Sequence, residues 1–227
     1  MQIAAFVLFS LLAPGAFAQP AASPQIVVTG EGTIKVTPDQ AWVSIGVESR
    51  SKVSKDAQQR NAQAMTAIQQ KIAGFGIPNE AIKTTAVDLQ LEFDYADGKQ
   101  TPRGYVARNT IEVRVDDLAK LGEVLDAVVN SGATMIHGLR FDVKERAALE
   151  ASALQRAVTN AMAKAGALAA GAKRAVDQIV KIEEIASGEP GPMPRQFAMA
   201  ARAEAATPVA PGELEIRAVV RVTASLK

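Results

Sequence analysis

The chain contains no cysteine, one histidine and one tryptophan among 227 residues, and aromatic residues make up only 4% of it. Without cysteine it can form no disulfide, no thiolate metal site, no thiol nucleophile and no lipid anchor on an N-terminal cysteine. A single histidine excludes a zinc site built from several histidines of one chain. The 25 basic and 24 acidic residues nearly cancel, so no net charge favours a nucleic-acid partner.

Apolar runs long enough to span a bilayer, about 20 residues, are also missing. The run from Ile3 to Leu12 is shorter, ends at Pro14-Gly15, and is followed by Ala16-Phe17-Ala18, the small-x-small pattern of a signal peptidase site. Residues 1–18 are therefore predicted to be a signal peptide cleaved after Ala18, with a buried core helix as the alternative. Met1-Gln2 supplies no basic residue, so either the true start lies upstream or the α-amino group alone carries the positive charge. Export predicts a periplasmic location, with an association with the outer membrane left open.

Beyond a flexible leader at residues 19–25, hydrophobic periodicity predicts strands and helices in mixed order. The predicted strands are 26–36 (interrupted at 30–32), 41–48, 87–95, 107–114, 139–143, 178–186 and 214–222. The predicted helices are 54–72, 118–128 and 144–170. This order, which includes hairpins, predicts an α+β fold in which helices pack on one face of a largely antiparallel sheet. We expect one domain over residues 26–225.

The clearest local prediction is a hairpin formed by residues 87–95 and 107–114. In the first strand Val87, Leu89, Leu91, Phe93 and Tyr95 alternate with polar and acidic residues, and the second strand carries arginines on its polar side. Asp97-Gly98 is typical of a hairpin turn, which is expected to run past Pro102. Opposed acidic and basic outer faces favour cross-strand pairing.

The longest predicted helix has an apolar stripe made mostly of alanine. Small side chains allow a helix to lie close to the surface that it covers. The sequence therefore predicts an unusually close helix contact after residue 144. The predicted stripe consists of Leu154, Val158, Ala161, Ala165 and Leu168.

A long segment without periodicity, residues 188–212, carries five prolines and three glycines. Such loops are uncommon in compact domains and tend to be functional or disordered. Met193, Phe197 and Met199 within it are typical of an adaptable contact surface. Disorder and self-association or client contact remain alternatives, and removal of residues 190–210 is expected to weaken any assembly.

Trp42 is the other candidate interface residue. It alternates with Ala41, Val43 and Ile45, so it is expected to lie on the opposite face of its strand. A second small core, a strand edge and a subunit contact are all consistent with that position, and tryptophan is enriched at interfaces.

Potential catalytic and metal-binding residues have simpler structural interpretations. Gly30-Glu31-Gly32 lacks the third glycine and the following helix of a dinucleotide loop, so a bulge or tight bend is expected. His137 has the same strand parity as Leu139 and is expected to face the core. The acidic residues of the strand 87–95 are expected to be solvated. The sequence predicts no catalytic residue, no metal site, no cofactor and no enzyme.

The chain carries two neighbouring N-terminal motifs, Val28-Thr-Gly-Glu-Gly-Thr-Ile-Lys-Val-Thr-Pro-Asp-Gln-Ala41 and Ser44-Ile-Gly-Val47. They are followed in order by Gly104-Tyr105, Val115-Asp116-Asp117-Leu118, Gly122 to Leu125, Gly132-Ala133 and the alanine-rich helix after Glu145. In these motifs and their order the sequence resembles the SIMPL-domain family of exported bacterial envelope proteins. The resemblance implies a non-enzymatic protein linked to envelope or oxidative stress, in a family of which some members form large ring-like or channel-like assemblies.

Three hypotheses of function follow. The first is a self-assembling periplasmic protein, a homo-oligomer with a structural or stress-protective role and an envelope protein as a further partner. The second is a monomeric binding module for a peptide or small ligand. An envelope hydrolase is the third, weakened by the lack of a nucleophile, a base or a metal cluster in the sequence.

Overall fold

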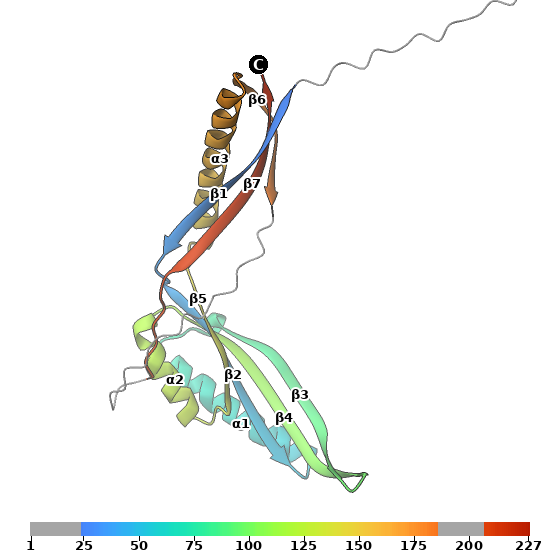
Figure 1. The fold of residues 1–227 in the computed structure, drawn as a ribbon. Helices are drawn as coiled ribbons and strands as arrows, with labels where there is room; N and C mark the ends of the chain where they lie inside the picture. Colours follow the sequence, from blue (N-terminus) through green and yellow to red (C-terminus); the bar gives the residue numbers. More distant parts are fainter. Residues whose placement is uncertain (1–23, 186–206) are drawn as a thin grey trace, which may run out of the picture.

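The computed structural model describes residues 24–185 and 207–227 and contains two antiparallel sheets, each with its own helices and hydrophobic core (Figure 1). The predicted α+β fold with antiparallel strands is confirmed, although the strands divide between two sheets. The first strand pairs with the last in a three-stranded sheet, and residues 40–142 form the four-stranded sheet together with its two helices. The predicted signal peptide and residues 188–206 lie outside the described residues.

The four-stranded sheet has the order β3-β4-β2-β5 and is covered on one face by two helices. Alternation along β2 directs Ala41, Val43, Ile45 and Val47 toward this helical layer, where all four are buried. The strands are β2 (Gln40–Ser51), β3 (Ile82–Ala96), β4 (Lys99–Val115) and β5 (Met135–Asp142), and the helices are α1 (Ser54–Ala73) and α2 (Leu121–Asn130). Short 3-10 turns, η1 (Asn79–Ala81) and η2 (Leu118–Lys120), precede β3 and α2.

The three-stranded sheet has the order β1-β7-β6 and carries the long helix α3. Its elements are β1 (Gln25–Val36), α3 (Arg146–Gly171), β6 (Val176–Ile185) and β7 (Leu214–Leu226). The predicted close contact of the alanine-rich helix is confirmed, but the buried row is shifted, and Leu168 is 56% exposed. The buried residues of α3 are Ala153, Ala157, Ala161, Ala165 and Ala169.

The expected bulge or bend at residues 30–32 is wrong, because β1 runs through them without a break in register. The glycines serve the helix contact. A Cβ at Gly30 would overlap the Ala157 carbonyl oxygen, and one at Gly32 would overlap the Ala153 carbonyl oxygen. Glycine and alanine therefore match across the interface, and the backbone of α3 lies directly on β1.

The predicted hairpin is confirmed as β3 and β4, with a shorter turn than expected. Only Asp97 and Gly98 form the turn, with φ values of 50° and 73°, and pairing resumes at Lys99 opposite Ala96. Two positive φ values define the turn type that matches the twist of paired strands. Pro102 therefore lies within the strand, opposite Phe93 beside a register shift.

The expected core-facing position of His137 is wrong because β5 contains a bulge. Val43 pairs with Leu139, but Ser44 pairs with His137, so Gly138 is left over with a φ of 66°. One extra residue reverses the parity of the strand before it. His137 consequently lies opposite Ser44 on the outer face, where it is exposed.

The last part of the predicted irregular segment has a defined place. The Thr207 N–H and hydroxyl donate hydrogen bonds to the Asp126 carboxylate of α2, at 3.1 and 2.5 Å. Val209 packs against the core of the four-stranded sheet. The chain thus contacts the helical layer of one sheet before it enters β7 of the other.

Candidate functional site

The outer face of the four-stranded sheet lies opposite the layer of α1 and α2, and within residues 24–185 and 207–227 no helix packs on it (Figure 1). Polar and charged side chains of all four strands share this face. The central strand β2 contributes Trp42, Ser44, Glu48 and Arg50. This outer face is the candidate site.

Trp42 lies between two arginines at one end of the outer face. Strand register places Arg114 of β4 opposite it on one side and Arg140 of β5 on the other. The two guanidinium carbons lie 6.0 and 5.6 Å from the centre of the ring, within the range of cation–π attraction. Trp42 therefore points away from the helices, as the alternation predicts, whereas its role as a subunit contact stays a prediction.

A hollow of about 430 Å³ lies beside Trp42. It is lined by Gln40, Trp42, Arg114, Asp116 and Lys144. A second hollow, of about 260 Å³, shares Arg114 and Asp116 and has apolar walls from residues 75–78, which follow α1, and from Val124 of α2. The Arg114 guanidinium donates to both oxygens of Asp116, at 3.0 and 3.4 Å, so a two-pronged ion pair forms part of both walls.

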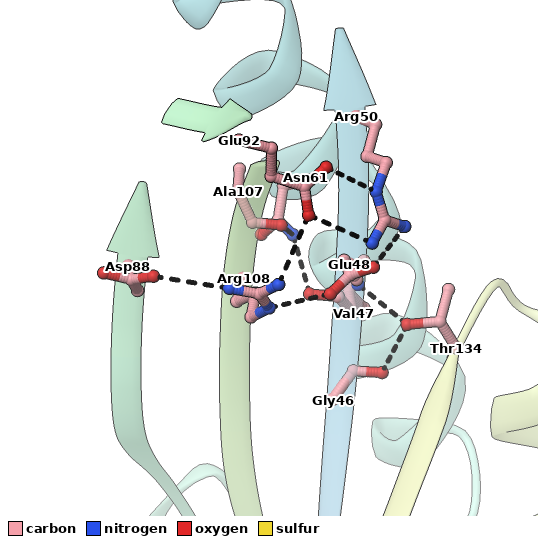
Figure 2. Close-up of polar contacts among 10 residues, drawn as sticks. All are labelled: Gly46, Val47, Glu48, Arg50, Asn61, Asp88, Glu92, Ala107, Arg108 and Thr134. Atoms are coloured by element: carbon pink, nitrogen blue, oxygen red, sulfur yellow. Dashed lines mark hydrogen bonds and ion pairs between the residues drawn. The ribbon is translucent and has the colours of Figure 1, made fainter. Parts of the chain in front are cut away.

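A charge cluster occupies the other end of the outer face (Figure 2). Arg108 donates to Glu48 at 2.7 Å and lies 3.8 Å from Asp88 and 3.7 Å from Glu92. Arg50 binds Glu92 at 3.0 Å and also pairs with Glu48. The predicted pairing of acidic and basic outer faces is therefore present, and it extends to a third strand. The charge cluster consists of Glu48, Arg50, Asp88, Glu92 and Arg108.

Mutual pairing stabilises the charged forms within this cluster. The hydrogen bond from Arg50 lowers the pKa of Glu92, and the same bond raises the pKa of Arg50. The lowered pKa keeps the Glu92 carboxylate ionised near neutral pH, and the raised pKa keeps the Arg50 guanidinium protonated. The cluster holds three carboxylates and two guanidinium groups and so has one net negative charge, and each exposed pair contributes little stability on its own.

Asn61 of α1 anchors the sheet beneath the charge cluster (Figure 2). Its buried side-chain amide donates to the carbonyl oxygens of Val47 in β2, at 2.8 Å, and Ala107 in β4, at 2.9 Å. On the far side of β2 the Glu48 N–H donates to the Thr134 hydroxyl at 2.7 Å. These bonds fix the backbone from which Glu48 projects.

Asp142 joins the two sheets at the end of β5. It accepts hydrogen bonds from the Val143 amide at 2.9 Å, from Arg140 at 3.0 Å and from Arg146 of α3 at 3.3 Å. Burial acts to raise the pKa of Asp142, but these hydrogen bonds outweigh burial, so the pKa lies below its ordinary value. No pattern in the sequence indicates this role, since it depends on where β5 ends and α3 begins.

An exposed apolar row runs along β3, an edge strand of the sheet. Val87 is 71% exposed and Tyr95 is 77% exposed, because α1 packs on β2 and β4 and leaves the edge strand β3 largely uncovered. The row was visible in the sequence as an alternation, but its exposure was not. The row consists of Val87, Leu89, Leu91, Phe93 and Tyr95.

The remaining predicted candidates divide into two groups. Met193, Phe197 and Met199 lie outside the described residues, so their proposed contact role stays a prediction. Within the described ranges, no three histidine, aspartate or glutamate side chains come together as a group able to hold a metal ion.

Comparison with known proteins decides the family. A family model described as SIMPL, a protein of unknown function (DUF541), matches residues 26–224, which include both sheets. The chain belongs to the SIMPL family. The resemblance in the N-terminal motif is thereby confirmed over nearly the whole chain.

Two sets of relatives place this SIMPL protein further. The 26 kDa periplasmic immunogenic protein of Brucella abortus is 32% identical, over 96% of this chain and 94% of its own length, and that of Brucella melitensis is 31% identical over the same shares. The uncharacterized protein YggE of Escherichia coli K12 is 29% identical, over 77% of this chain and 71% of its own. No helix in the described part of the chain is long and apolar enough to cross a membrane.

Proposed function

We propose that this SIMPL protein is an exported periplasmic protein that acts by self-association and has a structural or stress-protective role in the envelope, without catalysing a reaction. The apolar row on β3 is the observation that carries the proposal. A long exposed edge strand offers unpaired backbone groups and, here, apolar side chains to another chain. The periplasmic name of the Brucella relatives supports the location.

The charges beside the row favour a particular geometry of association. If two β3 strands paired antiparallel about Gln90, Asp88 of one chain would face Glu92 of the other. Pairing of β3 of one chain with β5 of another, the strand at the opposite edge of the sheet, would instead bring Asp88 and Glu92 toward Arg140 and His137. We therefore expect head-to-tail contacts between different edges, which close into rings or extend into filaments.

The test measures the solution mass of residues 19–227 by light scattering after gel filtration. The unaltered chain should have a mass of several chains, and Leu89→Lys should reduce it toward one chain, because the new charge must be desolvated in the contact. Ile182→Lys is the matched control: Ile182 is 48% exposed, close to the 43% of Leu89, and lies on β6, an edge of the other sheet.

Thermal unfolding separates association from folding. Leu89→Lys should keep a cooperative transition, since its site is already partly solvated. A monomeric unaltered chain would contradict the proposal. Dissociation by Ile182→Lys with no effect of Leu89→Lys would move the contact to the three-stranded sheet.

The hypothesis of a binding module for a peptide or small ligand has its own observation in the hollow beside Trp42. Self-association and ligand binding can be tested separately, because they involve different surfaces. The hollow beside Trp42 lies at one end of the outer face, the charge cluster lies at the other end, and the apolar row lies on the edge strand β3.

A further inference from the structure

We propose that the hollow beside Trp42 binds a small molecule through a single carboxylate group. This inference concerns a different surface from the β3 row, and it does not depend on self-association. It rests on the charges that line the hollow, on the hydrogen-bond donors of its lining and on its place at the links that connect the two sheets.

The charges that line the hollow leave one positive charge uncompensated. Arg114 and Asp116 neutralise each other through their ion pair at 3.0 Å. Lys144 also lines the hollow, and no acidic group of the described residues lies within ion-pair distance of its Nζ. Arg140, over the other side of the ring, is already compensated by Asp142 at 3.0 Å. Counted over the lining side chains, one monoanion would therefore balance the charge; the Asp39 carboxylate, which accepts from the Lys144 N–H, is not among them.

Hydrogen-bonding capacity at the hollow favours an acceptor-rich ligand. Lys144 and Arg114 carry only donors, and the Gln40 amide adds two more. The indole Nε1–H of Trp42 is buried and has no acceptor among the described residues. Because that N–H is shielded from solvent, the donors of the lining that a ligand can reach are those of Lys144 and Arg114.

A carboxylate fits this arrangement better than a phosphate. The Arg114 fork already holds the planar carboxylate of Asp116, and its remaining N–H groups offer the same geometry to a second one. A phosphate would bring nearly two negative charges close to Asp116 against one free positive charge. The volume of about 430 Å³ lies in the lower part of the range for small-ligand pockets.

The hollow also lies at the connections between the sheets, where ligand sites are common. Gln40 begins β2 directly after the link from β1, and Lys144 lies in the link from β5 to α3. The Lys144 N–H donates to the Asp39 carboxylate at 2.9 Å, which ties these two links together. A ligand bound by Lys144 would add a second connection between these two links and so stabilise the folded chain.

Trp42 provides a direct readout because it is the only tryptophan in the chain. The probes are N-acetylphenylalanine, which carries a carboxylate, and N-acetylphenylalanine amide, which has the same body without the charge. Tryptophan emission of residues 19–227 should change saturably with the acid and not with the amide, at constant ionic strength. Acetate and inorganic phosphate form two further arms. Binding of acetate alone would point to a free small acid, and binding only of the acylated amino acid would point to a peptide C-terminus.

Variants decide whether the hollow is responsible. Lys144→Gln should weaken binding of the acid about tenfold, the scale expected for loss of one charged hydrogen bond. Lys71→Gln is the matched control, since Lys71 is exposed on α1, which covers the opposite face. Equal binding of the amide, equal or tighter binding of phosphate, or unchanged binding by Lys144→Gln would overturn the proposal. The same titration on Leu89→Lys should give the same affinity, so failure of self-association leaves this test intact.

Discussion

Gly30 of β1 lies directly against the backbone of Ala157 in α3. A Cβ at Gly30 would overlap the Ala157 carbonyl oxygen and stand 2.5 Å from the Ala161 nitrogen, and both of these are backbone atoms that cannot rotate away. The same relationship repeats at Gly32 and Ala153, one turn earlier along α3. The glycines of the family motif are thus explained by packing, with no ligand involved.

Gly30→Ala is therefore expected to lower the free energy of unfolding by about 3 kcal/mol, because α3 must move off the sheet to admit one methyl group. Urea unfolding followed by circular dichroism measures this. Gly166→Ala, in α3 on the other side of this contact, is the control: a Cβ there meets nothing within 4 Å, and alanine is the better helix former. The free energy of unfolding of the Gly166→Ala variant should rise slightly. An equal loss in both variants would show that the close contact is not the cause.

Asn61→Ala should cost about 2 kcal/mol of stability, because the Val47 and Ala107 carbonyls lose a buried donor at 2.8 and 2.9 Å. Thr66→Ala is a control on the exposed side of α1, where the hydroxyl only donates back to the Ala62 carbonyl of the same helix. Its effect should stay within about 0.5 kcal/mol. Urea titration of both variants provides the comparison, and similar losses would count against an anchoring role of Asn61.

The Asp142→Asn variant should lose stability in a pH-dependent manner. Hydrogen bonds from Val143, Arg140 and Arg146 hold the folded-state pKa of Asp142 below its ordinary value despite burial. The unfolded chain therefore takes up the proton more readily, so acid favours unfolding. The contribution is fully present above the ordinary aspartate pKa, about 4, and disappears as the pH falls through the lower folded-state value.

The measurement is the melting temperature of both proteins between pH 7 and pH 2. The difference between them should be largest at pH 7 and should shrink below pH 4. Glu184→Gln serves as the control, since Glu184 is exposed on β6 and no ion pair is recorded for it within the described residues. A gap that stays constant with pH would mean that the Asp142 carboxylate does not carry this charge-dependent contribution.

Local chemistry explains which parts of the fold could be predicted from the sequence. The Asp97-Gly98 turn and the alternation on both sides of it specify a hairpin within one stretch of chain, and α1 shows its buried face through Ile68 and Ile72. The division into two sheets could not be predicted in this way. It depends on β1 pairing with β7, almost 190 residues away, and no local pattern encodes that choice.

The candidate site was predictable to a similar extent. Alternation placed Trp42 on the outer face, but its arginine neighbours follow from the register of three strands. The exposure of the β3 row depends on which strands α1 packs on, and the function of Gly30 depends on a helix more than 120 residues later. Each of these features belongs to tertiary packing, which periodicity does not contain.

His137 tests the bulge in β5. With Gly138 left over at a φ of 66°, His137 is exposed opposite Ser44, whereas uninterrupted alternation with Leu139 would bury it beneath the helices. Diethyl pyrocarbonate should therefore modify the folded chain at its single histidine at nearly the rate of N-acetylhistidine, as followed by absorbance and located by peptide mass. The rate at which His137 is modified in the unfolded chain, measured in the same way, is the internal reference. Strong protection in the folded state alone would contradict the bulge and return His137 to the core.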